Sequence, residues 1–336
     1  MSTMSENFNY HSIDKSVFDE KLSNDSRFIE YRRQWRENPS NGVIANFPLH
    51  LDIESTNACN LKCPYCAATS NSWGKNKKGF MDFDLFKKVI NEASGEGCYC
   101  VKFSLRGEPL LHPKLSEMIK YAIDSGIIDC YFNTNGMKLT EEVTHKLIDA
   151  ELPRISISVD GWDKKSFEKN RIGADYELVC NNIKSLLEIR NRRNVKFPKL
   201  RIQTVMLSEM REHWDEYIKH WSGIADEVGF LDAREEGAGI DHRGVSCKDF
   251  FCPFLWQRMT ILWDGTLLPC LMHGVDDFDL MSFENIKNIS IKEAWHSTRE
   301  NCYRKLHRSG MSHELKACDR CSYRAMEINK IGISDK

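Results

Sequence analysis

Three closely spaced cysteines, Cys59, Cys63 and Cys66, constrain this chain more than any other feature of its sequence. With three and then two residues between them, they allow one short loop to wrap around a single iron–sulfur cluster. A cubane 4Fe–4S cluster has four irons, so three thiolates leave one iron open to another ligand. Structural zinc sites instead use paired Cys-x-x-Cys motifs that fill all four positions. The motif predicts a cluster with an open iron; the alternatives are a zinc site with a distant fourth ligand, or three unrelated cysteines.

The motif resembles that of the radical S-adenosylmethionine (SAM) enzymes. In that family the open iron is chelated by the amino and carboxylate groups of SAM. The reduced cluster then cleaves SAM to a 5′-deoxyadenosyl radical, which abstracts a hydrogen atom from the substrate. Tyr65, directly before the last cysteine, matches the aromatic residue that typically lies beside the adenine, although it could also be a packed loop aromatic. The resemblance implies an enzyme with a SAM-binding 4Fe–4S cluster.

From Pro48 onward, short apolar strands alternate with amphipathic helices. This alternation predicts an α/β fold with a parallel sheet and right-handed crossovers. Periodicity alone allows a doubly wound sheet or a curved partial barrel, and the resemblance implies a partial (β/α)6 radical SAM barrel with a small C-terminal α+β iron–sulfur domain. Strands are expected at His50–Glu54, Cys100–Leu105, Ile128–Asn133, Arg154–Val159, Leu200–Met206 and Glu227–Leu231, and helices at Asp84–Ala93, Leu115–Asp124, Thr140–Ala150, Tyr176–Arg190 and Met210–Trp221.

The N-terminal part precedes this alternation. Residues 1 to about 12 look disordered, and the spacing of apolar residues from Ser16 to Trp35 predicts one or two helices packed on the core. The run Asn38-Pro39-Ser40-Asn41-Gly42 is expected to break the chain. We divide the chain into an N-terminal helical extension (1–46), a radical SAM core (47–232), a linker or substrate loop (233–246) and an auxiliary cluster domain (247–330).

Polar turns follow the predicted strands. In parallel α/β folds, binding sites gather at the carboxyl ends of the strands. The three cysteines follow the first strand, Gly107-Glu108-Pro109 the second, Asn133 ends the third, and Ser158 and Asp160 lie at the end of the fourth. These residues are therefore expected to face one rim of the barrel.

Gly107, Glu108 and Pro109 resemble the family's glycine–glutamate motif, in which backbone and acid bind the methionyl amino group of SAM. A small residue suits a close approach of the backbone to the ligand, and a carboxylate suits an ammonium partner. Arg106 stands where the family often has the first glycine. Without this context the same three residues would be a turn.

The resemblance also gives expected SAM contacts farther along the chain. Ser158 and Asp160 resemble residues that bind the ribose hydroxyls, although they could cap the strand end. Arg171 resembles an arginine that reaches the SAM carboxylate, or it is a solvated surface arginine. Met206 could belong to an apolar shelf for adenine or to the buried core, and Asn133 faces the rim.

A second cysteine group in the C-terminal part of the chain begins before a predicted strand pair, which is joined at Asp264-Gly265, and continues after it. Its members Cys252, Cys270, Cys318 and Cys321 match the twitch domain, the reduced form of the SPASM extension of radical SAM enzymes. By this resemblance they hold one auxiliary 4Fe–4S cluster with no open iron. A structural zinc site bound by the same four thiolates is the alternative.

Composition restricts the partners. Thirteen cysteines without an export signal favour metal ligation in a reducing compartment, so a cytoplasmic location is expected. A net charge of −2 gives no general basic field for nucleic acid or anionic membrane. No apolar run approaches the roughly 20 residues that span a bilayer.

The resemblance implies a substrate radical whose electron passes to the auxiliary cluster. In related twitch enzymes this oxidises a sugar-like alcohol to a ketone. We therefore expect an oxidoreductase acting at a carbinol carbon of a carbohydrate, aminocyclitol or nucleotide-sugar, with a flavodoxin or ferredoxin as reductant. Oxidation needs a deprotonating group near the rim, and Asp232 and Arg234, closest to the last strand, are the candidates.

Three other functions are compatible with the sequence. A sugar or cyclitol epimerase would return a hydrogen to the opposite face, and Cys247 could donate it or be a spare thiol. A peptide-modifying enzyme, of the RiPP or sulfatase-maturing type, often carries an N-terminal recognition domain and a full SPASM extension, which this sequence does not show. A non-enzymatic iron–sulfur or zinc module would not cleave SAM.

Overall fold

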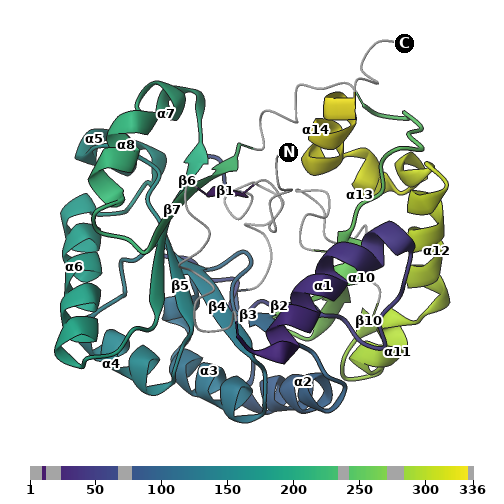
Figure 1. The fold of residues 1–336 in the computed structure, drawn as a ribbon, viewed down its shortest axis with the longest axis horizontal. Coiled ribbons are helices and arrows are strands. Elements are labelled where there is room, and N and C mark those ends of the chain that lie inside the picture. Colours follow the sequence, from purple (N-terminus) through teal and green to yellow (C-terminus); the bar gives the residue numbers. More distant parts are fainter. Residues whose placement is uncertain (1–9, 13–23, 67–77, 234–241, 271–283, 332–336) are drawn as a thin grey trace.

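The computed structural model describes residues 10–12, 24–66, 78–233, 242–270 and 284–331. In these ranges one curved sheet is lined on its outside by helices, and the C-terminal elements close one end of the curve (Figure 1). The strands are β1 Tyr10–Ser12, β2 His50–Ile53, β3 Cys100–Lys102, β4 Asp129–Thr134, β5 Arg154–Ser158, β6 Lys199–Met206, β7 Glu227–Asp232, β8 Arg258–Ile261, β9 Thr266–Leu268 and β10 Glu284–Asn285.

The strand order is β1-β7-β6-β5-β4-β3-β2-β8-β9-β10. Strands β2 to β7 are parallel to their neighbours in sequence order, so the predicted open α/β barrel is confirmed. The helices are α1 Ser26–Asn41, α2 Phe83–Gly95, α3 Leu115–Asp124, α4 Glu141–Asp149, α5 Lys164–Asn170, α6 Tyr176–Arg192, α7 Ser208–Glu212, α8 Trp214–Trp221, α10 Phe254–Gln257, α11 Ile291–Trp295, α12 Thr298–Arg308, α13 Lys316–Asp319 and α14 Ser322–Ile331, with 3₁₀ turns η2 Pro109–Leu111 and η4 Ser312–Glu314.

The two faces of each barrel strand differ in chemistry because side chains alternate along a strand. In β2, Leu51 and Ile53 belong to the main apolar core between the sheet and its helices. His50 and Asp52 alternate with them and face the inside of the barrel, where both are buried. The inside, which we call the lumen, is therefore lined by polar and charged groups.

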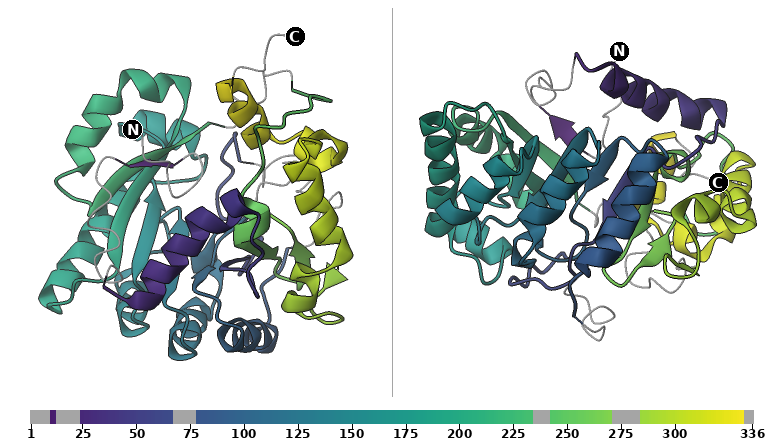
Figure 2. Two further views of the ribbon diagram at one scale, coloured as in Figure 1. Left: turned by 45° about the vertical axis from the view of Figure 1, so that its right-hand side comes forward. Right: turned by 90° about the horizontal axis from the view of Figure 1, so that it is seen from below.

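Helix α1 covers the amino end of this lumen. Its Phe28, Tyr31 and Trp35 pack in a cluster with Leu49 and Tyr131, at the starts of β2 and β4. Figure 2 shows α1, in purple, crossing one end of the barrel. The expected N-terminal helix is confirmed from Ser26; residues 13–23 lie outside the described ranges.

Two N-terminal expectations are wrong in part. Helix α1 does not end before Asn38: it continues to Asn41 with Pro39 inside, and Gly42 ends it in the left-handed conformation (φ 67°). The last turn tolerates proline because a single helical hydrogen bond is lost there. The expected disorder is also wrong for Tyr10–Ser12, which pairs antiparallel with β7; a three-residue edge strand carries too little pattern to be recognised.

Two elements differ from expectation by more than two residues at an end or in their number. The second strand ends at Lys102 rather than Leu105. The helix expected over Met210–Trp221 is two helices, α7 and α8, which meet at His213. In the described part of the chain, no helix is long and apolar enough to cross a membrane.

The C-terminal elements continue the barrel sheet. Strand β8 pairs in parallel with β2, and β9 pairs antiparallel with β8 around the predicted turn, where Gly265 has a φ of 93°. Helices α11 to α14 lie at this end, on the opposite side of the molecule from α4, α6 and α8 (Figure 1). The small domain is thus joined to the barrel by backbone hydrogen bonds as well as by the connecting chain.

Candidate active site

The first cysteine loop leaves the carboxyl end of β2. Backbone N–H of Leu61 donates to Cys59 Sγ (3.5 Å), and Cys66 N–H donates to the Cys63 carbonyl (3.1 Å). Burial raises the pKa of the Cys63 thiol to about 11. Three thiols on one turn of chain fit the ligand set of a cluster with an open iron. In the described ranges no group of three His, Cys, Asp or Glu side chains is arranged so that it could hold a metal ion. The cluster ligands are therefore inferred from the type of donor and the spacing of the cysteines.

Gly107 packs against this loop. A Cβ at position 107 would lie 2.2 Å from the Thr56 carbonyl oxygen and 2.6 Å from that of Ala58, much closer than any side chain allows. The next residue, Glu108, donates its N–H to the Ala58 carbonyl (2.8 Å). We expected glycine here for the approach of a ligand; the close neighbour in the structure is the backbone that leads into the cysteine motif.

The Glu108 carboxylate is buried and mostly engaged by the chain. It accepts hydrogen bonds from the Thr134 hydroxyl (2.6 Å), Asn135 N–H (2.7 Å) and Leu110 N–H (3.1 Å). Burial raises its pKa, and these hydrogen bonds act in the opposite direction. A carboxylate has about four acceptor positions, so one position stays available for an ammonium donor such as the expected methionyl amino group.

Asp160 brings together three of the residues predicted from the sequence. Its carboxylate, 1% exposed, accepts from the Tyr65 hydroxyl and forms an ion pair with Arg171, whose Nη2 lies 2.6 Å away. It also accepts the N–H of Val205 (2.8 Å). Burial and the Asp160 charge raise the pKa of Tyr65. Asp160 thus ties the cysteine loop to β5 and β6; its expected contact with ribose stays a prediction.

A buried ion pair at the same rim was not foreseen. Arg106 binds Glu54 through two hydrogen bonds, one of them from Nη2 to Oε2 at 2.6 Å. Glu54 lies directly after β2 and also accepts the N–H of Trp263 from the small domain (3.4 Å). The sequence feature that could have predicted this ion pair is an acid at the end of the first strand together with an arginine just past the second. The pair joins both domains beside the cysteine loop.

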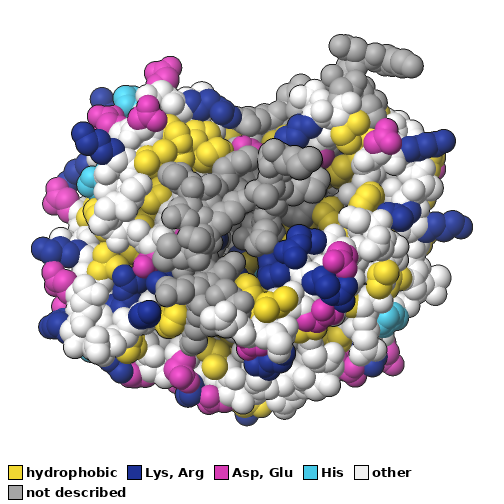
Figure 3. Space-filling model, in the orientation of Figure 1, with side chains coloured by type: hydrophobic (Ala, Val, Ile, Leu, Met, Phe, Trp, Pro, Cys, Tyr) yellow, Lys and Arg dark blue, Asp and Glu magenta, His cyan; other side chains and the backbone are white. Residues whose placement is uncertain are grey.

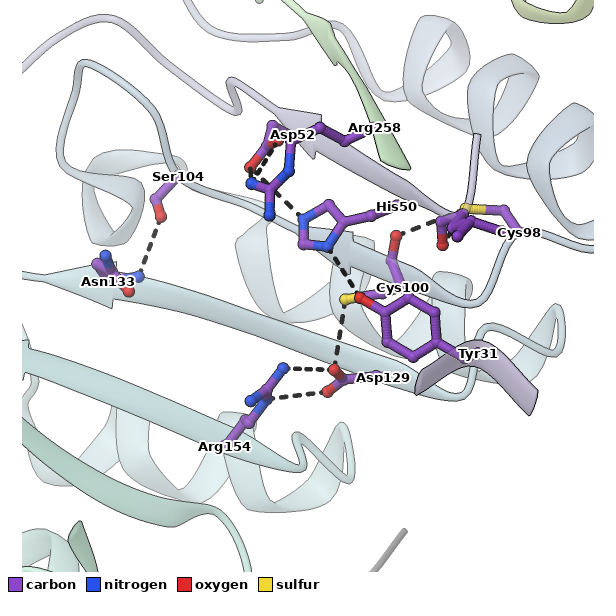
Figure 4. Close-up of polar contacts among 11 residues, drawn as sticks. Tyr31, His50, Asp52, Cys98, Cys100, Ser104, Asp129, Asn133, Arg154 and Arg258 are labelled. Atoms are coloured by element: carbon purple, nitrogen blue, oxygen red, sulfur yellow. Dashed lines mark hydrogen bonds and ion pairs between the residues drawn. The ribbon is translucent and has the colours of Figure 1, made fainter. Parts of the chain in front are cut away.

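Other predicted rim residues have more local contacts. Asn133 N–H donates to Ser104 Oγ at 3.0 Å (Figure 4), and Ser158 Oγ accepts from Gln203 Nε2 at 3.4 Å. Pro109 is buried at the start of η2. Met206 packs in the main core between sheet and helices, where it alternates with the inward-facing positions.

The three predicted catalytic residues are not brought together in the described ranges. Asp232 ends β7 on the face shared by Val228 and Phe230, which contact the outer core. Arg234 lies outside the described residues. The Cys247 side chain is 1% exposed and packs inside the small domain, in a cluster with Phe250, Cys321, Tyr323 and Ile328.

The second cysteine group converges in the small domain. Burial raises the pKa of Cys252, and the nearby thiols of Cys270, Cys321 and Cys318 raise it further. His307 connects two of the four: its Nδ1 accepts from Cys252 N–H (3.1 Å), and its Nε2 lies 3.4 Å from Cys318 Sγ. Four thiols, of which Cys270 and Cys321 are buried and Cys252 and Cys318 partly buried, fit a closed cluster site.

The lumen contains a layered set of ion pairs. Asp52 pairs with Arg258 (3.2 Å), and Asp129 binds Arg154 through two hydrogen bonds, as Figure 4 shows. The sequence signal for these pairs is the alternation of charged with apolar residues inside short strands. These charged residues face the lumen, whereas the apolar residues between them face the helices.

Outside the lumen, Figure 3 shows positive and negative side chains interspersed over the visible face, in keeping with the net charge of −2.

Two family models match the chain. The Radical SAM superfamily model matches residues 53–219, and the iron–sulfur cluster-binding domain called SPASM matches residues 252–322. Each match contains one of the two cysteine groups.

Curated relatives cover the chain to different extents. A probable GTP 3′,8-cyclase of Methanococcus maripaludis is 35% identical over 139 residues, which is 41% of this chain and 45% of the relative, so the match spans less than half of that protein. The tungsten-containing aldehyde ferredoxin oxidoreductase cofactor-modifying protein of Pyrococcus furiosus is 22% identical over 82% of this chain and 87% of the relative.

Solved structures share the fold. BtrN in complex with AdoMet and 2-DOIA has a TM-score of 0.54 and 19% identity, over 83% of this chain and 94% of BtrN. Native anSMEcpe with bound AdoMet has a TM-score of 0.59 and 17% identity, over 86% of this chain and 99% of that protein. Streptococcus suis SuiB bound to S-adenosylmethionine has a TM-score of 0.57 and 15% identity, over 92% and 80%.

Proposed function

The chain carries a radical SAM domain followed by a C-terminal SPASM domain, and we propose that it oxidises a carbinol carbon of a carbohydrate, aminocyclitol or nucleotide-sugar to a ketone. When bound, SAM and the two 4Fe–4S clusters supply a 5′-deoxyadenosyl radical and an acceptor for the second electron. Cys59, Cys63 and Cys66 would hold the first cluster, and Cys252, Cys270, Cys318 and Cys321 the second.

The chain's own residues would fix the cysteine loop for this chemistry. Gly107 lets the loop after β3 pack on the backbone that precedes Cys59. Asp160, two residues after β5, anchors Tyr65 and Arg171. Glu108 keeps one acceptor position for an ammonium group. Because these groups are already hydrogen-bonded, SAM would bind a preorganised rim.

The observation that most supports oxidation is the second thiol set and its attachment to the barrel. Net oxidation of a substrate radical needs an electron acceptor, and the four cysteines of the small domain would provide a site for one. Strand β8 bonds directly to β2, and Trp263 donates to Glu54 beside the cysteine loop. The auxiliary site is therefore held in a fixed relation to the SAM-binding loop.

A polar substrate suits the lumen. Its inward positions carry ion pairs and hydroxyl groups, which favour a hydroxylated molecule over an apolar one. BtrN, which shares the fold, was solved with 2-DOIA as well as AdoMet, but SuiB was solved with a precursor peptide, so peptide modification is the competing activity. A cytoplasmic flavodoxin or ferredoxin is the proposed reductant.

Epimerisation has less support. A hydrogen donor has to reach the substrate radical, whereas the Cys247 side chain is buried among apolar neighbours of the small domain. In deuterated water, deuterium at an inverted carbon would identify an epimerase, and a ketone product would identify a dehydrogenase.

The test begins with anaerobic reconstitution and a count of iron and acid-labile sulfide. About eight of each per chain are expected for two 4Fe–4S clusters. Replacing Cys252, Cys270 and Cys318 together by Ala should leave about four iron atoms per chain. This variant should still cleave SAM but should form no ketone from any member of a panel of sugars, cyclitols and nucleotide-sugars. Cys302→Ala, at an exposed thiol, is the control. Four irons with zinc in the second site of the unaltered protein would overturn the proposal.

A further inference from the structure

The carboxylates that line the lumen have their own cations. Asp52 pairs with Arg258, Asp129 with Arg154, and Glu227 with Arg201 at 2.7 Å. Nearer the cysteine loop, Glu54 pairs with Arg106. Each of these acids therefore has its charge balanced by a neighbouring arginine.

Lys102 adds a cation to this set. It ends β3 on the inward face, where Asp52 of β2 and Tyr131 of β4 are its register partners. It makes no hydrogen bond and no ion pair of 4 Å or less within the described part of the chain, because Arg258 already occupies Asp52. Burial lowers the pKa of Lys102; the Asp52 charge opposes this effect and the Arg258 charge adds to it. The lumen thus holds an ammonium group with no acid of its own.

Two further donors on the same inward face lack acceptors in the described ranges. Thr260 Oγ1 and Arg258 Nε are both buried and have no hydrogen-bond partner in the described ranges. Thr260 of β8 and Lys102 of β3 are both register partners of Asp52 on β2, so they lie in one row on either side of Asp52, and Arg258 is the preceding inward position on β8. Leaving a buried donor unpaired lowers stability, and leaving a charge unbalanced lowers it further. An incoming acceptor would relieve both costs.

We propose that Lys102, Arg258 and Thr260 bind an oxyanion of the substrate, a phosphate or a carboxylate, inside the barrel. The inference rests on the proposed oxidation of a sugar-like molecule and narrows its substrate to an anionic one. A neutral hydroxyl could accept these hydrogen bonds, but only an anion also balances the ammonium charge. The three residues lie within β3 and β8, before the strand ends at which the cysteine loop begins. The anionic end of the substrate would therefore lie deeper in the barrel, and its carbinol carbon would face the SAM site.

Three probes that share the same sugar ring but differ in charge test the proposal: glucose, glucose 6-phosphate and glucuronate. Each is titrated by calorimetry into the reconstituted protein with SAM present. At least one anionic sugar is expected to bind ten-fold or more tightly than glucose, and the stronger one distinguishes phosphate from carboxylate. Lys102→Met should abolish this difference and Lys102→Arg should retain most of it. Lys146→Met, at an exposed lysine paired with Glu142, should change nothing. Equal binding of all three sugars, or an unchanged preference in Lys102→Met, would overturn the proposal.

The test separates this inference from the proposed function. SAM cleavage without substrate, followed by chromatography, reports whether each variant is folded and loaded. Anion binding that depends on Lys102, with no ketone formed from any alcohol, would preserve the site and refute the oxidation. Oxidation of neutral sugars, with no tighter binding of anionic ones, would support the proposed oxidation and refute the oxyanion site.

Discussion

Gln257 donates a hydrogen bond from Nε2 to the main-chain carbonyl of Trp35, at 2.7 Å. This is the carbonyl that Pro39 leaves without a helical donor, because proline has no N–H to offer four residues along α1. Both side chains, Trp35 and Gln257, are buried. The proline inside α1 thus creates an acceptor that α10, directly before β8, satisfies.

Replacing Gln257 by Leu should lower the free energy of unfolding by about 1–3 kcal/mol, because the buried carbonyl loses its donor. Urea unfolding of the reconstituted protein measures this loss. In a Pro39→Ala background the helix regains its own N–H, so the same substitution should cost clearly less. Equal costs in both backgrounds would show that the bond is not the cause.

Gly107→Ala should impair cluster assembly, since its methyl group would overlap the Thr56 and Ala58 carbonyls and displace the loop that carries Cys59. We expect a loss of about half the iron, from the SAM-binding cluster, and loss of SAM cleavage. Gly95→Ala is the matched control because no atom lies within 4 Å of its added methyl. Full iron content in Gly107→Ala would contradict the packing argument.

His307→Phe should lower the reduction potential of the auxiliary cluster. Because Nδ1 accepts from Cys252 N–H, the ring proton is on Nε2 and points to Cys318 Sγ. Hydrogen bonds to cluster sulfurs stabilise the reduced, more negative state. A redox titration followed by electron paramagnetic resonance measures the change, with His145→Phe as an exposed control. An unchanged potential with a full auxiliary cluster would refute the role.

Glu300 should make stability depend on pH. It is 0% exposed, and burial raises its pKa to about 7, against the opposing charge of Arg304. Between about pH 4.5 and 7 the folded chain holds this proton and the unfolded chain does not, so stability falls as pH rises, by up to about 3 kcal/mol.

Urea unfolding at several pH values checks the effect of Glu300. Glu300→Gln should flatten the profile in that range, and Glu314→Gln, at an exposed carboxyl, should not. If the free energy of unfolding falls with pH at the same slope in Glu300→Gln, groups other than Glu300 cause the pH dependence.

Local patterns predicted the barrel well because each strand and helix carries its own period. Helix α3 was expected with its observed bounds, and β5 and β6 within one residue at each end. The first cysteine motif was equally readable, since its three cysteines lie close in sequence, whereas Cys252, Cys270, Cys318 and Cys321 were assigned through the resemblance to the twitch domain. The pairing of Tyr65 with Asp160, 95 residues apart, has no local signal in the sequence, because only the folded sheet brings their strand ends together.

Long-range sheet pairing also explains what was missed around the lumen. Alternation marks Lys102 as inward or outward, but the competition between Arg258 and Lys102 for Asp52 depends on β8 joining β2. Nothing in residues 258–261 predicts a parallel partner more than 200 residues earlier. The residues of the proposed oxyanion site therefore became visible only in the folded chain.

The β2–β8 ladder has a consequence for how the molecule comes apart. Without β8, β2 would be an edge strand with exposed backbone groups, and it is the strand that leads into the first cysteine loop. The two cluster-bearing parts should thus unfold as one cooperative unit. A protein that has lost its auxiliary iron would then be expected to become more accessible to proteases near Cys59, far along the chain from the site of the damage.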